Sequence, residues 1–553
     1  MTWHFANVWE AVADLVPEAP ALACGEARRT WREYDDRASR IASALKAAGI
    51  KKGAKAAIYA TNCNEYLEAQ FGTFKASCCP INVNYRYTEA ELIYLFENSD
   101  SEAVFFETRF GPRLRAIRDR LPKLKLFVDI PDGTAGCIDD AVDYETLIRS
   151  HAPAPRETRS EDDLYMLYTG GTTGMPKGVL LRHGDFSRGF AERSAAGRQL
   201  PPPVLLNDWL RLVAQIHAEG TVPTAIPACP LMHGAGCWMG AFSPHLMGGC
   251  AVTIRGDHFD PDELWRVAAR ERATELVIVG DAFAKPLLAS LHRARDAGRM
   301  PDLSALQKIL STGVMFSHET KRTLLELLDV EIFDGMGSTE GGSLGTSIIS
   351  RATPVADTGR FVTSPGVKVF NALDREVTPG SDEAGIIGNG GVWAIGYYKD
   401  EAKTAATFRV IDGVRYAFPG DFAKVAADGS LILLGRGSAC INTGGEKVFP
   451  EEVEEAFKAH PGVADCLVVG VPDERFGERV TAVVSLQNGL AIDERTLLDY
   501  GRARVAGYKL PKRIVLVDKV ERAANGKADY KWAKAVALAD SASAQSAVRE
   551  PVQ

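Results

Sequence analysis

Residues 168–179, with the sequence YTGGTTGMPKGV, are the segment that most constrains what this chain can fold into. Its glycines allow backbone conformations that turn successive N–H groups toward one point, and its threonine hydroxyls add hydrogen-bond donors. Lys177 supplies a point charge suited to a polyphosphate. A glycine-rich segment alone is commonly a surface turn. The density of phosphate-compatible groups after the apolar residues 164–168 instead predicts a phosphate-binding loop.

The segment is not the nucleotide loop of kinase-like ATPases. That loop requires Gly-Lys followed by Ser or Thr. In this chain Lys177 lies between Pro176 and Gly178. We therefore expect a phosphate site of another class.

Strand and helix patterns alternate along most of the first 330 residues. Helical spacing is found in residues 31–48, 66–76, 208–218, 262–272 and 318–328, and strand-like apolar runs in residues 56–60, 103–106, 126–130, 251–254, 275–280 and 308–310. Such alternation predicts an α/β fold of mainly parallel sheets covered by helices. Parallel sheets bind ligands at loops leaving their strand ends, and we expect the run 164–168 to be one such exit.

Charge and composition exclude several classes of protein. The net charge of −8 argues against a general nucleic-acid binder, which needs a basic face. The cysteines form no CxxC pair and the histidines no HExxH pair, which argues against zinc and a disulfide framework and favours a reducing cytoplasm. No apolar run reaches the ~18 residues that a membrane span needs. The N-terminus has the pattern of an amphipathic helix and not of a signal peptide.

Three further motifs carry candidate site residues. Residues 230–236 (PLMHGAG) place His233 among glycines, where a histidine is more often packed than catalytic. Residues 329–342 (DVEIFDGMGSTEGG) place Glu340 after Ser338 and Thr339, oxygen groups that suit Mg²⁺, although a lone Glu in such a loop is also typical of solvated surface. Asp421 follows a proline–glycine turn, and it either presents its carboxylate to a diol or caps the turn.

The composition changes twice toward the C-terminus. Short strands and glycine turns from residue 364 to about 434 predict a small β-rich unit. Glycines in residues 435–455 predict a seam between domains, followed by a compact α+β domain. We expect an N-terminal domain over residues 1–434, a hinge over 435–438, and a C-terminal domain over 439–536 that carries Lys527 on an exposed loop. Residues 537–553 are small and polar and are expected to be disordered.

These motifs, in this order, resemble those of the adenylate-forming superfamily, which contains acyl-CoA synthetases, luciferases and peptide-synthetase adenylation domains. The string TGGTTGMPKG resembles the phosphate loop of that superfamily. PLMHGAG, GYYKD, GRGSACINTGGEKVFPEEVE and NGKADYKWAK are similar, almost letter for letter, to motifs of bacterial acyl-CoA ligases of the fatty-acid and steroid-side-chain type. The resemblance covers about residues 2–534 and implies ATP, Mg²⁺ and coenzyme A as cofactors.

The resemblance implies two half-reactions. ATP and a carboxylic acid first give an acyl-adenylate and pyrophosphate, and the thiol of CoA then attacks the acyl carbon and releases AMP. The first step brings two anions together, so cations and oriented N–H donors must offset the charge on the α-phosphate. The second step implies a mobile C-terminal domain that rotates about the hinge and withdraws Lys527.

The implied roles carry over position by position. Lys527, Thr339, Glu340 and His233 are the implied catalytic residues, and Glu340 would hold Mg²⁺. The β- and γ-phosphates would be bound by Thr169, Gly170, Gly171, Thr172, Thr173, Gly174 and Lys177, and the α-phosphate would be contacted by Thr339. The adenine would lie against Gly313, Val314, Met315, Asp334, Gly335, Met336 and Gly337, and Ser338 is a further implied cofactor-binding residue. The ribose would be bound by Asp421, with Arg436 beside it, and the pantetheine by Thr443, Gly444 and Gly445. The acyl group would lie among His233, Gly234, Ala235, Gly236, Asp281 and Phe283, where small residues leave room for a bulky or long apolar acid.

The chain departs from the family pattern at several positions. Met336 replaces a common Tyr, so the adenine would rest on a thioether. Ser438 stands at the hinge position usually held by Asp, and Asn442 where a Lys is usual. Residues 418–421 read FPGD where relatives often have Arg-Thr-Gly-Asp. These departures bear on adenine packing and domain rotation and not on the type of reaction.

Three alternatives remain at this point. An adenylating enzyme that loads a separate carrier protein, a luciferase-like oxygenase, and a non-catalytic nucleotide- or lipid-binding protein share parts of the pattern. The sequence does not separate a medium- or long-chain fatty acid from a steroid or aryl acid. A homodimer is expected from the base rate of oligomers alone.

Overall fold

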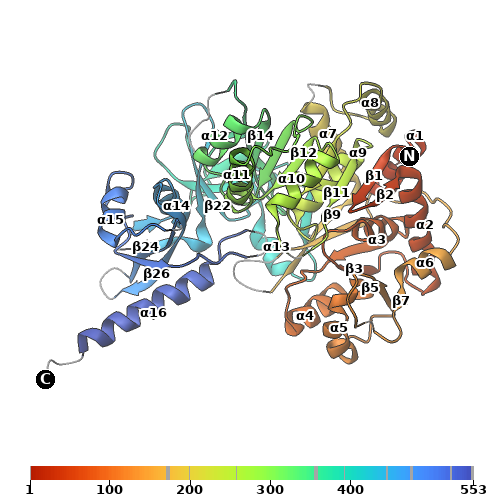
Figure 1. Cartoon of the computed structure of the whole chain (residues 1–553), viewed down its shortest axis with the longest axis horizontal. Coiled ribbons are helices and arrows are strands. Elements are labelled where there is room, and N and C mark those ends of the chain that lie inside the picture. Colours follow the sequence, from red (N-terminus) through yellow and green to blue (C-terminus); the bar gives the residue numbers. More distant parts are fainter. Residues whose placement is uncertain are drawn as a thin grey trace.

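The structure is a computed structural model, and it describes residues 2–136, 138–169, 175–197, 200–256, 258–353, 359–391, 393–443, 446–473, 477–487, 489–523 and 526–549. The first part of the chain forms two mainly parallel sheets with their helices, and the last part forms a smaller unit at the opposite end (Figure 1). The predicted mixed α/β class is confirmed.

One five-stranded sheet near the N-terminus is entirely parallel, in the order β4-β3-β5-β6-β7. Its strands are β3 (Lys55–Tyr59), β4 (Cys79–Asn82), β5 (Ser101–Glu107), β6 (Leu126–Ile130) and β7 (Val142–Asp143). The connecting helices are α3 (Asn64–Lys75), α4 (Glu89–Ser99), α5 (Gly111–Ile117) and α6 (Tyr144–Ser150). Thr88 and Glu91 form a capping box that starts α4, as Thr30 and Glu33 do for α2 (Trp31–Ala47).

The largest sheet has fifteen strands, and its first half is the second parallel layer. Strands β1 (Pro20–Cys24), β11 (Cys250–Thr253), β10 (Thr224–Pro227), β12 (Glu275–Ile278), β13 (Lys308–Thr312) and β14 (Glu331–Ser338) run parallel in that order, and β2 (Ala27–Thr30) pairs antiparallel with β1. The helices of this region are α1 (Phe5–Leu15), α2 (Trp31–Ala47), α9 (Ser243–Leu246), α10 (Pro261–Arg270), α11 (Gly280–Asp296) and α12 (His318–Leu327).

The second half of this sheet is antiparallel and makes the predicted β-rich unit. It contains β15 (Gly342–Ile349), β16 (Arg360–Thr363), β23 (Leu431–Arg436), β22 (Asp421–Val425), β18 (Gly385–Asn389), β21 (Val414–Ala417) and β20 (Phe408–Ile411), with β17 (Val367–Phe370) paired to β18. Strands β14 and β15 form an antiparallel hairpin, so the turn at Thr339–Glu340 joins the parallel half to the antiparallel half.

The run before the phosphate segment is not an exit from a parallel sheet, and that prediction was wrong. Strand β8 (Leu164–Thr169) pairs antiparallel with β9 (Lys177–Arg182), and β9 pairs with β19 (Ala394–Tyr397) in a separate three-stranded sheet. Thr169 is opposite Lys177 in this register. The physical reason is that the apolar residues of β9 follow the glycine segment closely enough to fold back on β8, so the segment connects the two arms of a hairpin.

Two helices follow this hairpin. The predicted helix at 208–218 is α8 (Leu206–Ala218), and α7 (His183–Ala196) precedes it. Helix α13 (Glu401–Thr407) follows β19, and Asp400 caps its N-terminus by accepting a hydrogen bond from the N–H of Lys403 at 2.9 Å.

The C-terminal unit is a five-stranded sheet with helices on it. It contains β24 (Ile441–Thr443), β25 (Glu446–Val448), β26 (Val463–Asp473), β27 (Gly477–Leu486) and β28 (Arg513–Val517), with α14 (Pro450–Lys458), α15 (Glu494–Arg502) and α16 (Tyr530–Arg549). Helix α16 includes residues 537–549, and the disorder predicted for residues 537–553 stays a prediction. Alanine is the strongest helix former, and Ala533 and Ala537 are buried against the sheet.

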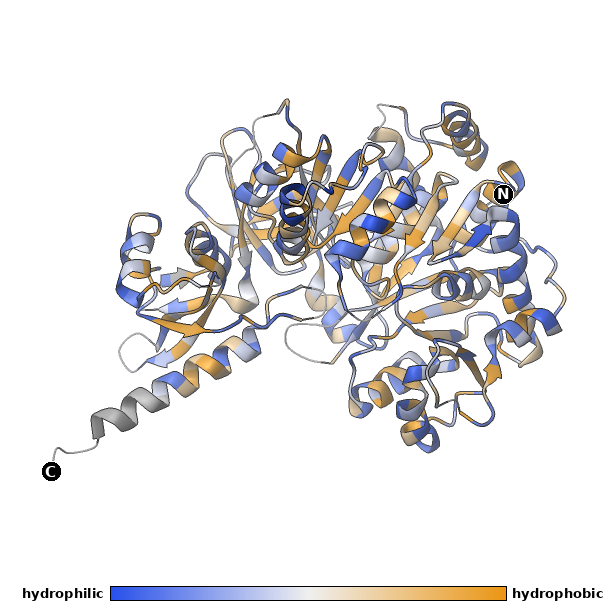
Figure 2. Cartoon of the chain, in the orientation of Figure 1, coloured by the Kyte–Doolittle hydropathy of each residue, from blue (hydrophilic) through white to orange (hydrophobic). Residues whose placement is uncertain are grey.

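Apolar residues concentrate on the strands, and hydrophilic residues concentrate on the outer helices (Figure 2). The buried side chains form separate cores, one around the N-terminal helices, one in the second parallel layer and one in the C-terminal unit. Among the described residues, no helix has both the length and the apolar character needed to cross a membrane. The carboxyl ends of the parallel strands of the large sheet lie along one edge of that sheet, and β14 ends there at Ser338, next to the predicted site residues Thr339 and Glu340.

Candidate active site

The turn between β14 and β15 presents Thr339 and Glu340. Ser338 closes this turn, because its hydroxyl accepts a hydrogen bond from the N–H of Gly341 at 2.8 Å. Asn389 holds the turn from the β-rich side: its amide donates to the carbonyl of Gly341 at 2.6 Å. The Ser338 hydroxyl is thus used in building the turn, whereas the side chains of Thr339 and Glu340 remain partly accessible.

The carboxylate of Glu340 and the ammonium of Lys177 are both held by one segment, residues 396–400 (GYYKD). The hydroxyl of Tyr397 donates to Glu340 Oε1 at 2.7 Å. Lys177 Nζ lies 2.7 Å from Asp400 Oδ2. This ion pair lowers the pKa of Asp400. Sequence analysis used GYYKD only as a mark of resemblance, but the structure joins it to the predicted phosphate and metal residues.

Thr169 and Lys177 face each other across the β8–β9 hairpin. The five residues predicted between them to bind phosphate, Gly170, Gly171, Thr172, Thr173 and Gly174, lie outside the described residues, as do Gly444 and Gly445. Their roles stay predictions. Thr443, the described member of the predicted pantetheine loop, is buried at the end of β24 opposite Glu446.

Lys527 lies near predicted residues that are about 90 to 190 positions away in the chain. Burial lowers the pKa of Lys527, and Arg436 lowers it further, while the carboxylates of Glu340 and Asp421 act in the opposite direction. Arg436 and Asp421 are cross-strand partners on β23 and β22, with Arg436 Nε 3.3 Å from Asp421 Oδ1. The predicted catalytic lysine, metal carboxylate and ribose pair are therefore electrostatic neighbours, although the Lys527 side chain keeps solvent exposure.

The hairpin that carries Lys527 docks on the start of α11. Gly526 has a φ of +74°, and a Cβ on it would lie 2.8 Å from the Cβ of Ala282 and 3.5 Å from Phe283 Cε2. On the other side of the hairpin, Arg522 is paired with Asp465 at 2.6 Å. Glycine at 526 is thus required both by the backbone conformation and by this close approach.

His233 lies two residues before a π-helix over Ala235–Phe242, with Gly234 as its N-cap. Burial lowers the pKa of His233 to about 3, and the positive charges of Lys527 and Arg86 contribute to this shift. The imidazole is neutral at physiological pH, and its buried Nε2 has no hydrogen-bond partner among the described residues. A neutral ring with an unused nitrogen beside Lys527 can donate to or accept from a bound acid. π-Helical turns are frequent at functional sites.

The small residues after His233 have different surroundings. Gly234 and Ala235 are partly accessible. Gly236 is buried, and a Cβ on it would lie 2.5 Å from the carbonyl oxygen of Pro230, so glycine there serves the close packing of the π-helix on the preceding segment. Trp238, which sequence analysis did not select, is also partly accessible on this helix.

Asp281 and Phe283 both have structural partners at the start of α11. The carboxylate of Asp281 accepts a hydrogen bond from the N–H of Ser317 at 3.0 Å. Phe283 is buried and packs against Phe259, with ring centroids 4.8 Å apart. Their predicted part in acyl binding stays a prediction.

The predicted adenine-binding residues form two neighbouring segments at the ends of β13 and β14. Gly313 is exposed, and Val314 and Met315 are partly accessible. On β14, alternate residues point to opposite faces of the strand. Gly335 and Gly337 are on the accessible face, whereas Asp334 is buried and its carboxylate lies 2.5 Å from Lys321 Nζ.

The expected contact between adenine and the thioether of Met336 stays a prediction. Met336 is buried in the core of the β-rich unit with Leu344 and Phe361. It shares its strand face with Ile332 and Asp334, which are also buried. An adenine on the accessible face would therefore meet glycine backbone.

The predicted hinge, residues 435–438, contains the end of β23 and the start of a short 3₁₀ turn (Gly437–Ala439). Glu451 of α14 packs directly on it: a Cβ on Gly435 would lie 2.1 Å from the Glu451 carboxylate, and the N–H of Arg436 donates to Glu451 Oε1 at 3.4 Å. Burial raises the pKa of Glu451 to about 7, helped by the nearby charge of Glu454.

Sequence analysis missed Asn82, Arg86, Asn389, Tyr397 and Asp400. Asn82 ends a strand of a parallel sheet, a position at which polar residues commonly meet ligands, and this signal was available. The partners of Asn389, Tyr397 and Asp400 lie far away in the chain, so no local pattern pointed to their contacts.

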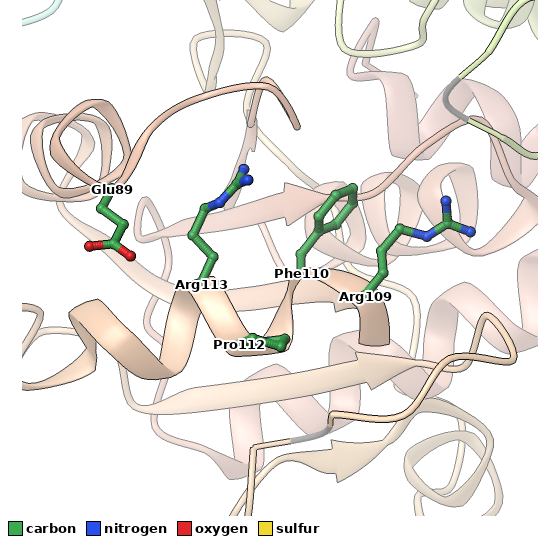
Figure 3. A pocket seen from close by; sticks show the side chains of 5 residues that line it. All are labelled: Glu89, Arg109, Phe110, Pro112 and Arg113. Carbon is green, nitrogen blue, oxygen red and sulfur yellow. The ribbon is translucent and has the colours of Figure 1, made fainter.

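A hollow of about 410 Å³ lies in the region of the N-terminal five-stranded sheet, β4-β3-β5-β6-β7, and Figure 3 shows it from close by. It is lined by Glu89, Arg109, Phe110, Pro112 and Arg113. Both arginines are already paired: Arg109 Nε lies 2.6 Å from Asp132 Oδ2, and Arg113 donates to the hydroxyl of Tyr59 at 3.1 Å. None of the described residues predicted for the active site lines this hollow.

Comparisons with known proteins agree with the geometry. Residues 9–398 match the family described as AMP-binding enzyme, and residues 452–527 match the AMP-binding enzyme C-terminal domain. The chain is 41% identical to a medium/long-chain-fatty-acid--CoA/3-oxocholest-4-en-26-oate--CoA ligase of Mycolicibacterium smegmatis, with 97% of each chain covered. It is 39% identical to a 3-oxocholest-4-en-26-oate--CoA ligase of Rhodococcus rhodochrous, with 97% of this chain and 96% of the relative covered.

Solved structures share the fold over nearly the whole chain. The anthranilate CoA ligase AuaEII, in complex with anthranoyl-AMP, superposes with a TM-score of 0.82 at 21% identity and covers 97% of this chain and 98% of its own. The ATP-bound MatB from Rhodopseudomonas palustris superposes with a TM-score of 0.78 at 25% identity, covering 96% and 98%.

Proposed function

Because the chain belongs to the family of AMP-binding enzymes, we propose that it is an acid–thiol ligase that converts a hydrophobic carboxylic acid to its CoA thioester in two steps. The observation that carries the proposal is the meeting of Lys527 with Glu340, Asp421 and Arg436. A lysine from the C-terminal unit placed beside the ribose pair and the proposed metal carboxylate has a chemical role if a phosphate is bound there.

In the first step, an oxygen of the acid's carboxylate attacks the α-phosphorus of ATP and pyrophosphate leaves with the electrons of the broken P–O bond. Two anions must approach, and the developing charge on the α-phosphate needs cations that are already in place. Lys527 bridges the carboxylate and the α-phosphate, and Thr339 donates to the α-phosphate. Lys177 and Thr169 bind the departing phosphates, and Asp421 binds the ribose hydroxyls.

Mg²⁺ is proposed at Glu340. The described residues contain no cluster of three or more His, Cys, Asp or Glu that could hold a metal ion. Mg²⁺ commonly takes only one or two protein carboxylates and completes its shell with substrate phosphates and water. The single, partly accessible carboxylate of Glu340, near the residues proposed to bind phosphate, fits this mode of coordination. When bound, the ion would offset phosphate charge.

His233 is proposed to contact the acid. Its ring is neutral, and Nε2 is buried without a hydrogen-bond partner among the described residues. Burying such a nitrogen costs free energy unless a ligand pairs with it. The acyl chain would then continue along the partly accessible residues of the π-helix, among them Gly234 and Ala235.

In the second step, the sulfur of CoA attacks the acyl carbon, the C–O bond to the phosphate breaks, and AMP leaves. The thiol must reach a carbon that Lys527 covers during adenylation. We propose that the C-terminal unit rotates about residues 435–438, which withdraws Lys527 and brings Thr443 and the following glycines to the pantetheine. Gly435, with a φ of +121°, supplies a backbone torsion that other residues rarely adopt.

The substrate class proposed is a medium- or long-chain fatty acid or a steroid side-chain acid. The relatives that are about 40% identical over nearly the whole chain are named for such acids. The competing proposal is an enzyme that transfers the acyl group to a separate carrier protein. It shares the first step and differs only in the thiol that accepts the acyl group.

The test is pyrophosphate release from purified protein with ATP and a panel of fatty, aryl and steroid acids, followed by analysis of the product with CoA. We expect acid-dependent pyrophosphate release and an acyl-CoA product with hydrophobic acids. A strong preference for acetate would overturn the substrate class. Pyrophosphate release without acyl-CoA formation would favour transfer to a carrier protein.

A further inference from the structure

Asn82 lies at the carboxyl end of β4 and contacts two segments that both enter the proposed active site. Its amide nitrogen donates to the carbonyl of Tyr168 at 2.8 Å and to the carbonyl of Met232 at 2.7 Å. Its amide oxygen accepts from the N–H of Tyr168 at 2.7 Å. Tyr168 directly precedes Thr169, and Met232 directly precedes His233.

These three bonds leave little freedom in how Asn82 sits. A primary amide has two N–H donors and one acceptor oxygen, and both donors are used on two different segments. The orientation of the amide is fixed by its partners, since two carbonyls require the nitrogen and one N–H requires the oxygen. A single side chain therefore fixes the distance between the backbone before Thr169 and the backbone before His233.

Asn62 offers a matched comparison in the same fold. It follows the neighbouring parallel strand β3, and its amide donates to the carbonyls of Pro227 and Cys229, each at 3.1 Å. Its oxygen accepts from the N–H of Leu231 at 2.7 Å. Asn62 thus makes the same number and type of hydrogen bonds to the segment before His233, but every one of them stays within that segment and none reaches β8.

We propose that Asn82 is a positioning residue that couples the phosphate side of the site to the acyl side. The inference rests on the proposed function, because it matters only if a phosphate and a carboxylate must meet. Adenylation requires Thr169 and Lys177 to hold the triphosphate while His233 holds the acid. The two bound molecules must lie at the distance that allows the carboxylate to attack the α-phosphorus. Asn82 sets the relative position of the two binding segments through their backbone, without touching either substrate.

The role predicts different effects on the two half-reactions. Before adenylation, ATP and the acid are separate molecules. A shift of about 1 Å between the residues that bind them lowers the rate of adenylation about 100-fold. Once the acyl-adenylate exists, its own covalent bonds fix the distance between acyl carbon and phosphate. The thioester step should therefore depend little on Asn82.

Two substitutions test this reasoning. Asn82→Ala removes all three bonds. Asn82→Asp is nearly isosteric, keeps the acceptor for the N–H of Tyr168, and loses the donors to the two carbonyls. If Asn82→Ala does not fold, Asn82→Asp still separates the cross-segment bonds from packing. Asn62→Ala and Asn62→Asp are the matched controls, since they remove equivalent bonds from one of the two segments alone.

Three measurements are made on each variant: the melting temperature, the affinity for the non-hydrolysable analogue α,β-methylene-ATP by calorimetry, and the rates of the two half-reactions. For the Asn82 variants we expect the analogue to bind about tenfold more weakly. The reason is that the backbone of Tyr168, in the β8–β9 hairpin, loses its hydrogen-bond partner. We also expect adenylation about 100-fold slower, and thioester formation from supplied acyl-adenylate within about threefold of the unsubstituted protein. The Asn62 variants should melt at similar temperatures and keep the affinity for the analogue.

Equal loss of both half-reactions in the Asn82 variants would overturn the inference. So would the same loss of analogue binding in the Asn62 variants, because packing alone would then account for it. Analogue binding is measured without an acid, so it reports how Asn82 positions the phosphate side even if no acid in the panel is a substrate. If the unsubstituted protein binds the analogue but makes no acyl-CoA, the proposed function fails while the analogue affinities still support or overturn the role of Asn82.

Discussion

The contact between Gly526 and the start of α11 allows the proposed domain movement to be tested with one methyl group. In Gly526→Ala the new Cβ would lie 2.8 Å from the Cβ of Ala282, closer than non-bonded carbons approach. Neither atom is at the end of a flexible side chain, so the hairpin or α11 must shift. The contact exists only while the hairpin that carries Lys527 is docked, which is the conformation proposed for adenylation.

The cost has two parts that act in different conformations. Gly526 has a φ of +74°, and placing a Cβ at such a φ costs about 1 kcal/mol wherever the hairpin is. Overpacking against Ala282 adds about 1–3 kcal/mol, and only in the docked conformation. At about 1.4 kcal/mol for each factor of ten, the second part slows adenylation about 5- to 150-fold. The thioester step requires the hairpin to be withdrawn, so the overpacking cost does not slow that step.

Gly489→Ala is the matched control. Gly489 lies in the same C-terminal unit with a φ of +82°, and a Cβ on it would meet nothing within 4 Å. It therefore carries the backbone cost without the clash. The assay compares pyrophosphate release with thioester formation from supplied acyl-adenylate, alongside melting temperatures. If Gly526→Ala slows both half-reactions equally, or if Gly489→Ala slows adenylation as much, the docking argument is refuted.

Three further predictions follow from the ionisable groups. Lys527→Ala should slow adenylation by about 10²–10³ with little effect on the thioester step, and the lowered pKa of Lys527 should make adenylation fall as the pH rises, earlier than for an ordinary lysine, as rate–pH profiles would reveal. Asp400→Asn keeps a good helix cap but removes the charged partner that holds Lys177 in place, so the KM for ATP should rise about two- to fivefold; a fall would mean that Asp400 competes with ATP for Lys177. Because the folded chain holds the Glu451 proton more tightly than the unfolded chain does, stability present near the ordinary pKa is lost as the pH rises toward 7. Glu451→Gln should abolish this loss in melting curves from pH 5 to 8, and retention of the slope would contradict it.

Much of the fold follows from local patterns. The helix over residues 31–48 has apolar residues at helical spacing and a capping box of Thr30 and Glu33, and both are local signals. The parallel layers follow from alternation of such helices with short apolar strands. The β8–β9 hairpin was missed because an apolar strand looks the same whether its neighbour is parallel or antiparallel, and only the pairing of Thr169 with Lys177 decides it.

Site residues were predictable from the sequence where the type of side chain is suited to a single chemical role. Lys177, Glu340, Asp421 and Lys527 stand in motifs that resemble those of a large superfamily. Met336 was a different case, because strand alternation places it with Ile332 and Asp334, and the apolar Ile332 already marks that face as buried. Its predicted adenine contact was assigned by position in a motif, and position in a motif does not say which face of the strand a residue occupies.

The residues that were not predicted from the sequence connect segments that lie far apart in the chain. The two-step reaction explains why such connections are needed. Lys177 and Glu340 belong to the N-terminal part and must stay in place through both steps, so fixed partners such as Asp400 and Tyr397 suit them. Lys527 must leave, and the hairpin that carries it meets α11 at the close approach of Gly526 to Ala282, a contact that is lost when the hairpin withdraws. Motifs record residue types, and they do not record which segments these residues bring together.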